Sequence, residues 1–176
     1  MIKKNRDSIV GVKVRLDKNI SNNGENEREV FKQALVAARS AEVPLMIHHT
    51  NSTISLEEVC DQLQAGDVYT HTFRLVILSE INRKTVSPHS QFAGEGSGIV
   101  DQTTGGVRKC VLSARAKGVM FDVGHGEGSF SWEIAGICAQ NGFYPDVIST
   151  DLHSGNIGGL AKDLPWVMSK FLHLGK

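Results

Sequence analysis

Short β-branched runs alternate with amphipathic stretches along the chain, and this alternation restricts the possible folds more than any other feature. The run Ile9–Leu16 is almost continuously apolar, whereas the apolar residues of 25–41 recur at helical spacing. The same strand-then-helix order repeats along the chain. The predicted strands are 9–16, 44–48, 67–71, 118–123 and 146–150, and the predicted helices are 25–41, 55–63, 107–117, 129–141 and 163–174. Because these strands alternate with helices and lack hairpin signals, we predict an α/β fold with a parallel sheet, either doubly wound or barrel-like.

The length of 176 residues suits one domain with a substantial core. We therefore assign residues 1–176 to a single domain. The periodicity is lost over 74–106, which is rich in Ser, Gly, Asn and Thr and contains Gly-Glu-Gly-Ser-Gly at 94–98. We predict that 74–106 is an irregular loop or an insertion.

Charge and composition exclude several classes of partner. Nineteen basic residues balance nineteen acidic ones, which argues against binding to nucleic acid or to anionic lipid. No apolar run approaches the ~20 residues of a membrane span, and the polar start does not resemble a signal peptide. The three cysteines are widely spaced in predicted helices, which is typical of reduced thiols. These features predict a cytoplasmic protein that binds neither nucleic acid nor a membrane.

Ionisable residues recur at the carboxyl ends of the predicted strands. His48 and His71 end two strands, and His125 and Asp151 directly follow two others. Lys13 lies toward the same end of the first strand. Because α/β folds build their active sites at this edge of the sheet, these residues are candidates for a common site.

Lys13 is unusual because it interrupts the apolar run "IVGVKVRL". A buried ammonium is costly, so the lysine is expected either to pair with an anion or to be chemically converted. A neutral lysine can react with carbon dioxide to form a carbamate, which can bridge two divalent metals. Together with histidine and aspartate ligands on other strands, such a group suits zinc.

The motifs extend this pattern. The strand lysine followed by "PLMIHH", "DVYTHTFR", "FDVGHGEGSFSWEIA" and "PDVISTDLHSGN" resembles the C-terminal half of amidohydrolase-superfamily metal-dependent hydrolases, in particular the dihydroorotase-like deacetylase group. The resemblance implies part of a (β/α)8 TIM-type barrel, about strands four to eight, with one or two divalent metal ions. It implies Lys13 as the carboxylated bridging lysine, His48 and His71 as imidazole ligands, and Asp151 as the metal-bound general base.

The resemblance also implies a substrate side of the site. The loop that contains His125 and Gly126 would face the substrate, and His153 lies just beyond Asp151 near the same rim. The implied reaction is hydrolysis of an amide or ester bond in a small acylated or cyclic-amide compound.

The sequence departs from this family in two ways. It contains no His-x-His pair, which completes the metal site in the family, and the strands of the first half of the barrel are absent. Strands curved for a closed barrel would leave unpaired edges, so we expect a homo-oligomer or pairing with a missing barrel half. Two alternatives to an active hydrolase are a catalytically inactive truncated remnant and a non-enzymatic module that binds a small molecule or anion at the glycine-rich turn 124–128.

The residues alone leave other interpretations open. Lys13 could extend to the strand end, His71 could be a hydrogen-bonded core histidine, and Asp151 could cap a turn. His48 and His49 are adjacent and must point to opposite faces of a strand, and alternation does not decide which one faces the barrel interior. The resemblance selects His48.

Overall fold

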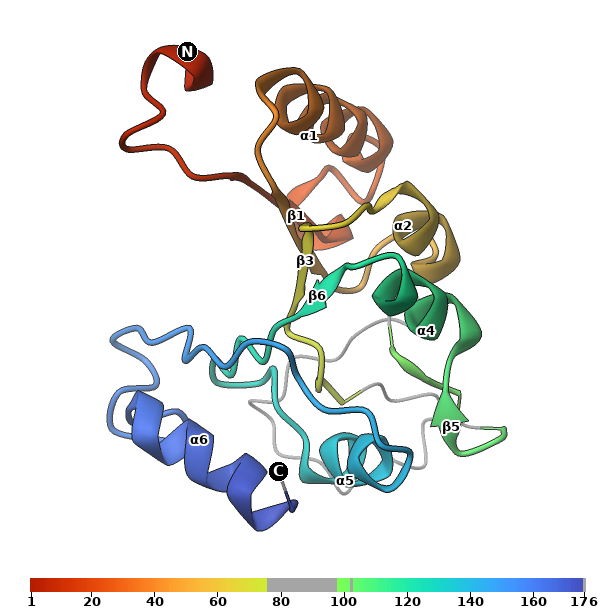
Figure 1. The fold of residues 1–176 in the computed structure, drawn as a ribbon, viewed down its shortest axis with the longest axis vertical. Helices are drawn as coiled ribbons and strands as arrows, with labels where there is room; N and C mark the ends of the chain where they lie inside the picture. Colours follow the sequence, from red (N-terminus) through yellow and green to blue (C-terminus); the bar gives the residue numbers. More distant parts are fainter. Residues whose placement is uncertain (76–97, 102, 176) are drawn as a thin grey trace.

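The computed structural model describes residues 1–75, 98–101 and 103–175. Its centre is a four-stranded parallel sheet in the order β1-β2-β3-β6 (Figure 1). The strands are β1 (Val12–Leu16), β2 (Leu45–His49), β3 (Val68–Thr70) and β6 (Met120–Phe121). The register aligns Val14 with Ile47 and Ile47 with Tyr69. The predicted α/β fold with a parallel sheet is confirmed.

The helices fall within or close to the predicted ranges. They are α1 (Glu27–Ala41), α2 (Leu56–Gln62), α4 (Lys109–Ala116), α5 (Trp132–Gln140) and α6 (Leu164–His173), with short 3-10 turns at Ile2–Lys4 and Lys18–Ile20. Ser55 accepts a hydrogen bond from the backbone N–H of Glu58 at 3.2 Å, and Asp163 accepts one from Trp166 at 2.8 Å. These side chains satisfy donors that a helix start leaves unpaired, which fixes where α2 and α6 begin.

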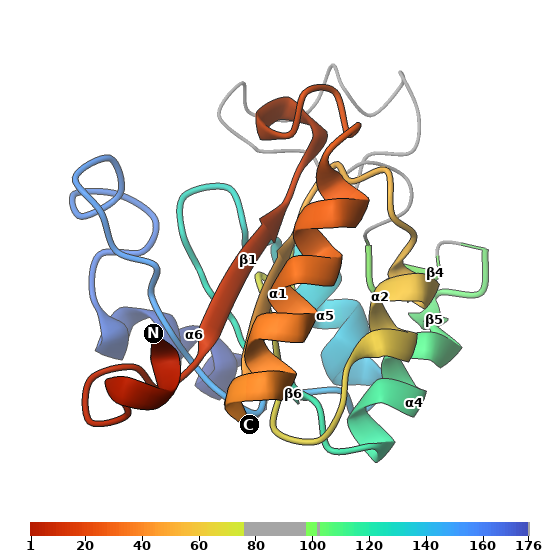
Figure 2. The same cartoon turned by 90° about the horizontal axis from the view of Figure 1, so that it is seen from above.

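One face of the sheet forms the hydrophobic core. Alternate residues of the strands point to this face and are buried: Val14, Leu16, Leu45, Ile47, Tyr69 and Phe121. Helices α1, α2 and α4 lie along this side of the sheet (Figure 1), and α1 runs beside β1 (Figure 2). Burial of these side chains stabilises the strand–helix layers, at roughly 25 cal/mol for each Å² of apolar surface removed from water.

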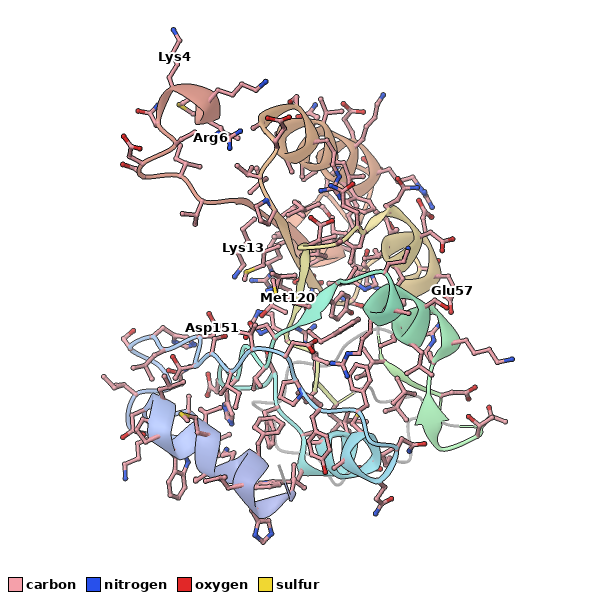
Figure 3. All side chains as sticks on the ribbon, in the orientation of Figure 1. Lys4, Arg6, Lys13, Glu57, Met120 and Asp151 are labelled. Atoms are coloured by element: carbon pink, nitrogen blue, oxygen red, sulfur yellow. The ribbon has the colours of Figure 1, made fainter. Side chains whose placement is uncertain are left out.

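The opposite face of the sheet is exposed around Lys13 and Met120 but buried at the strand ends, where His48 is 8% exposed. Lys13 and Arg15 of β1 are exposed on it, and Met120 and Val147 are 36% and 39% exposed. Figure 3 shows Lys13, Met120 and Asp151 on this side. The expectation that Lys13 is buried is therefore wrong, because strand alternation turns its side chain away from the helix-covered core. In a closed barrel this face of the sheet would be enclosed. Exposed apolar side chains on it are therefore expected when the barrel is incomplete.

The predicted last strand is less regular than expected. Residues 147–150 follow the segment 121–126 in parallel, with a single β-bridge between Asp122 and Val147. Backbone N–H groups of Val123, His125 and Gly126 donate to the carbonyls of Val147, Ser149 and Thr150 at 3.0, 3.1 and 2.9 Å. These bonds bring the carboxyl end of this segment to the edge of the sheet where β2 and β3 also end.

The irregular stretch 74–106 is described only at its two ends. Strands β4 (Val100–Asp101) and β5 (Gly106–Val107) form a short antiparallel hairpin. Residues 76–97 lie outside the described residues, so a loop or insertion there stays a prediction, as does the single-domain assignment. Within the described ranges, no helix is long and apolar enough to cross a membrane.

Candidate metal and active site

Two imidazoles lie side by side where β2 and β3 end. The ring centroids of His48 and His71 are 4.1 Å apart, and the rings meet edge to face at 63°. His49 points to the opposite face, where its Nε2 lies 2.8 Å from the carbonyl oxygen of Ile54. His48, rather than His49, therefore lies on the same face of the sheet as Lys13, although it is buried there.

The orientation of His71 is fixed by the neighbouring segment. Its Nδ1 lies 2.6 Å from the carbonyl oxygen of Gly124. Because a carbonyl can only accept, Nδ1 carries the proton and the lone pair of the neutral ring is on Nε2. Metal-ligating histidines commonly donate their other ring N–H in this way. His71 is thus oriented as a ligand would be.

Both rings are neutral at neutral pH. Burial, together with the neighbouring His71 and Arg74, lowers the pKa of His48 to about 2. Burial also lowers the pKa of His71 to about 4, as does Arg74, while the Gly124 carbonyl and the Asp151 carboxylate oppose the shift. A neutral imidazole is the form that binds a metal.

His48 is already engaged by two side chains. Its Nε2 lies 2.6 Å from Thr50 Oγ1 and 3.3 Å from an Arg74 guanidinium nitrogen. Arginine can only donate, so Nε2 accepts and its lone pair points toward Arg74. For His48 to bind a metal through Nε2, Arg74 and Thr50 must release it.

Lys13 and Asp151 approach this pair from two sides. Lys13 is in register with Met46, two residues before His48, so its backbone lies two residues short of the strand end. The Lys13 ammonium lowers the pKa of His71 and the Asp151 carboxylate raises it, so both charges lie within electrostatic reach of His71. Asp151 is exposed and adopts a left-handed φ of 46°.

Gly126 and His153 lie close to Asp151. A Cβ atom at position 126 would be 3.2 Å from Asp151 Oδ2, so the carboxylate packs against this glycine. Asn156 is buried and joins the loop: its side-chain amide donates to the Asp151 carbonyl at 3.0 Å and accepts from the His153 N–H at 2.8 Å. The His153 side chain is exposed, and its Nδ1 accepts from the Gly155 N–H at 3.1 Å.

His125 lies in a different environment from the expected substrate-facing one. It is 1% exposed, and its ring stacks on Phe130 with centroids 4.9 Å apart. Its Nε2 accepts a hydrogen bond from Lys170 Nζ of α6 at 2.6 Å, and its Nδ1 lies 2.9 Å from the Gly126 carbonyl oxygen. Both ring nitrogens are therefore used within the protein.

Asp122 is a site neighbour that the sequence analysis did not select. It is 2% exposed, and its Oδ2 accepts hydrogen bonds from Thr70 Oγ1 at 2.6 Å and Ser149 Oγ at 2.8 Å. Thr70 precedes His71 and Ser149 lies two residues before Asp151, so one carboxylate joins the two strand ends. Its Oδ1 has no hydrogen-bond partner among the described residues. A buried aspartate inside the apolar run "VMFDV" was the available sequence signal.

The donor set fits a divalent metal in part. The Nε2 lone pair of His71 has no hydrogen-bond partner among the described residues, and a carboxylate and a lysine lie within electrostatic reach of the ring. In the described ranges, however, no three His, Cys, Asp or Glu side chains are grouped closely enough to hold a metal ion. A metal at this place would need ligands beyond His71 and a rearrangement around His48.

Comparison with known proteins gives a consistent result. No protein-family model matches the chain. It is 32% identical over 171 residues to a deacetylase of Enterococcus faecalis, covering 96% of this chain and 41% of that protein. It is 31% identical over 168 residues to a deacetylase of Brucella anthropi, covering 96% and 36%. The chain thus spans about two fifths of the length of these relatives.

Solved structures show the same relationship. A crystal structure of an adenine deaminase superposes with a TM-score of 0.76 at 30% identity, covering 99% of this chain and 42% of that one. A dihydroorotase superposes with a TM-score of 0.77 at 30% identity, covering 99% and 40%. Both are amidohydrolase-superfamily proteins with a TIM barrel. The chain is therefore similar to about two fifths of the length of these amidohydrolase-superfamily proteins, and its parallel α/β sheet is consistent with part of a (β/α)8 barrel.

Proposed function

We propose that this chain contributes most of the metal and catalytic residues of an amidohydrolase-type hydrolase. The substrates are small acylated or cyclic-amide compounds, cleaved at an amide or ester bond. The observation that carries the proposal is the pair of neutral imidazoles, His48 and His71, at the carboxyl ends of adjacent parallel strands. The deacetylase relatives and the dihydroorotase-like fold support the same class of reaction.

In this proposal Lys13, His48, His71 and Asp151 hold one or two zinc ions, with Lys13 carboxylated by carbon dioxide. Zinc would supply a water acidified toward neutrality and would polarise the substrate carbonyl. Asp151 would accept a proton and return it to the leaving group, a general acid–base role worth about 10² to 10⁴ in rate. The exposure of Asp151 and its contact with Gly126 leave the carboxylate accessible to a substrate.

Gly126 and His153 form the proposed substrate side, and His125 is buried next to Gly126. Gly126 would allow a substrate to approach Asp151 closely, because a side chain at this position would meet the carboxylate. His153 would contact substrate from the exposed loop. His125 would act indirectly, because its Nδ1 contacts the Gly126 carbonyl and holds that residue in place.

The exposed part of the second sheet face supports pairing with another polypeptide. Apolar Met120 and Val147 and the unpaired edge of β1 would be covered by the missing barrel strands or by a second copy of the chain. Sedimentation of the purified chain as a dimer or larger species is expected. A monodisperse monomer that retains this fold would argue against the pairing.

Two alternatives have separate tests. An inactive remnant is favoured by the lack of a three-ligand group among the described residues. An anion-binding module would use the turn at Gly124, but a Cβ there would lie 2.3 Å from Thr70 Oγ1, so close packing already explains this glycine. The module would bind inorganic phosphate in the absence of metal.

The deciding experiment is elemental analysis of size-fractionated protein after exposure to zinc and bicarbonate. About one or more tightly held zinc ions per chain is expected, with loss of zinc in Lys13→Ala and His71→Ala. His173→Ala, in which an exposed histidine of α6 is removed, is the matched control and should retain zinc. Absence of zinc in folded protein would favour the inactive remnant.

A further inference from the structure

A buried guanidinium lies against the imidazoles of the proposed metal site. Arg74 follows β3 and is 4% exposed. Charged side chains are rarely buried to this extent unless an opposite charge accompanies them. Among the residues that the structure describes, no carboxylate forms an ion pair with Arg74, and its Nε has no hydrogen-bond partner. Within that part of the chain, uncharged groups alone hold the guanidinium.

The acceptors that hold Arg74 come from the end of β2 and the residue that follows it. One terminal nitrogen donates to Thr50 Oγ1 and lies 3.3 Å from the carbonyl oxygen of His49. The other terminal nitrogen lies 3.3 Å from His48 Nε2. The His71 ring is 4.1 Å from the His48 ring, and, besides burial, the charge of Arg74 lowers the pKa of both rings. A positive charge thus already lies beside the nitrogen through which His48 would bind a metal.

Thr50 strengthens this hold on His48. Because Arg74 can only donate, the Thr50 hydroxyl accepts from it, and the hydroxyl proton is left for His48 Nε2 at 2.6 Å. The neutral imidazole has a single acceptor lone pair, which cannot accept these hydrogen bonds and bind a metal at the same time. Departure of Arg74 would also free the Thr50 hydroxyl to rotate away.

We propose that Arg74 competes with the divalent metal for His48: its guanidinium occupies the imidazole in the metal-free chain and must leave before zinc binds there. The inference rests on the proposed function, because it concerns the metal site of that hydrolase. A divalent cation and a guanidinium repel each other, and both require the same lone pair. Arg74 therefore lowers the affinity of His48 for zinc. His71, whose Nε2 has no hydrogen-bond partner among the described residues, is the ligand that is available first.

Arg15 makes it possible to separate the contact from the charge. It is in register with His48 across the β1–β2 pair, and, besides burial, its charge also lowers the pKa of the His48 ring. Arg15 instead forms an ion pair with Asp17 at 2.6 Å. Arg15→Gln is thus the matched control, because it removes a positive charge near His48 and leaves the Arg74 contact intact.

The test is a zinc titration of the full chain in bicarbonate buffer, in competition with a chromophoric chelator. Arg74→Gln keeps a side-chain donor but carries no charge, and it should bind zinc at least about tenfold more tightly than wild type. This gain should disappear when His48→Ala is added to Arg74→Gln. Arg15→Gln should stay within about threefold of wild type.

Equal zinc affinity in wild type and Arg74→Gln would overturn the competition and leave the proposed metal site standing. Weaker binding by Arg74→Gln would also overturn it, because Arg74 would then support the site. An equal gain in Arg15→Gln would reduce the effect to general charge repulsion and so overturn the proposal. If neither wild type nor Arg74→Gln binds zinc, this inference and the proposed function both fail.

Should Arg74→Gln fail to fold, NMR of the arginine side chains of wild type gives an independent answer. Saturating zinc should shift the guanidinium signals of Arg74 and speed their exchange with solvent. The signals of Arg28, an exposed residue of α1, should not change. Bound zinc without a change at Arg74 would overturn the proposal, and wild type that binds no zinc would count against the proposed function as well.

Discussion

His71 and Gly124 are in direct backbone–side-chain contact: His71 Nδ1 lies 2.6 Å from the Gly124 carbonyl oxygen, and a Cβ on Gly124 would lie 2.8 Å from the same nitrogen. Gly124 also has a left-handed φ of 47°. The glycine is therefore required both by its backbone conformation and by the close approach of the imidazole. This contact sets the tautomer of His71 and hence its ability to bind a metal.

Gly124→Ala is expected to destabilise the protein by about 1 to 3 kcal/mol more than Gly142→Ala. Gly142 is the matched control because its φ is also positive, at 69°, but a Cβ there would meet nothing within 4 Å. Urea unfolding at neutral pH measures the difference. Equal destabilisation of the two variants would mean that the contact with His71 contributes nothing beyond the cost of the φ angle.

The buried histidines predict a loss of stability in mild acid. The pKa values of His71 and His49 are lowered to about 4, against 6.5 in the unfolded chain, so the unfolded state binds more protons below pH 6.5. Stability is therefore complete above pH 6.5 and decreases as the pH falls toward 4. Each such histidine contributes up to about 1.4 kcal/mol per pH unit.

The matching measurement is the free energy of unfolding of wild type and His71→Gln between about pH 7 and about pH 5. Glutamine keeps a side-chain donor for the Gly124 carbonyl but does not titrate. The variant should show a shallower decrease with acid than wild type. Parallel pH profiles would show that His71 does not bind a proton on unfolding.

The sequence predicted the elements whose signals are local. Ser55 followed by Glu58 predicted the start of α2, and the structure contains that cap. Alternation required His48 and His49 to face opposite sides, which the structure confirms, although the choice between them needed more than alternation.

The features that the sequence did not predict depend on tertiary contacts. Lys13 looked buried because its neighbours are apolar, yet burial depends on which face the helices cover. Asp122 was not selected because a single carboxylate in an apolar run does not reveal its partners. Those partners come from elsewhere in the sequence: Thr70 from β3 and Ser149 from the segment 147–150. The Lys170–His125 contact likewise joins residues distant in the sequence.

Asp122 and Ser149 are expected to be energetically coupled. Asp122→Ala should cost about 1 to 3 kcal/mol, because it leaves the buried Thr70 hydroxyl and the partly buried Ser149 hydroxyl without this acceptor. A double-mutant cycle with Ser149→Ala should give an interaction energy of about 0.5 to 3 kcal/mol. The control cycle combines Ser149→Ala with Asp146→Ala, since Asp146 instead accepts from the Phe121 N–H and pairs with Arg115. Additive energies in the Asp122 cycle would contradict the coupling.

Asp151→Asn separates catalysis from metal binding in the proposed hydrolase. The amide oxygen of asparagine can still approach a metal, but the side chain cannot accept and return a proton. Hydrolysis of a panel of small N-acetyl and O-acetyl compounds should therefore fall by about 10² to 10⁴, with zinc content unchanged. The assay uses the zinc-loaded species isolated by size fractionation. Asp163→Asn is the control, because Asp163 caps α6 and its substitution leaves every proposed site residue intact. Unchanged turnover in Asp151→Asn would refute the proton-transfer role of Asp151, and loss of zinc together with turnover would show that it acts chiefly as a ligand.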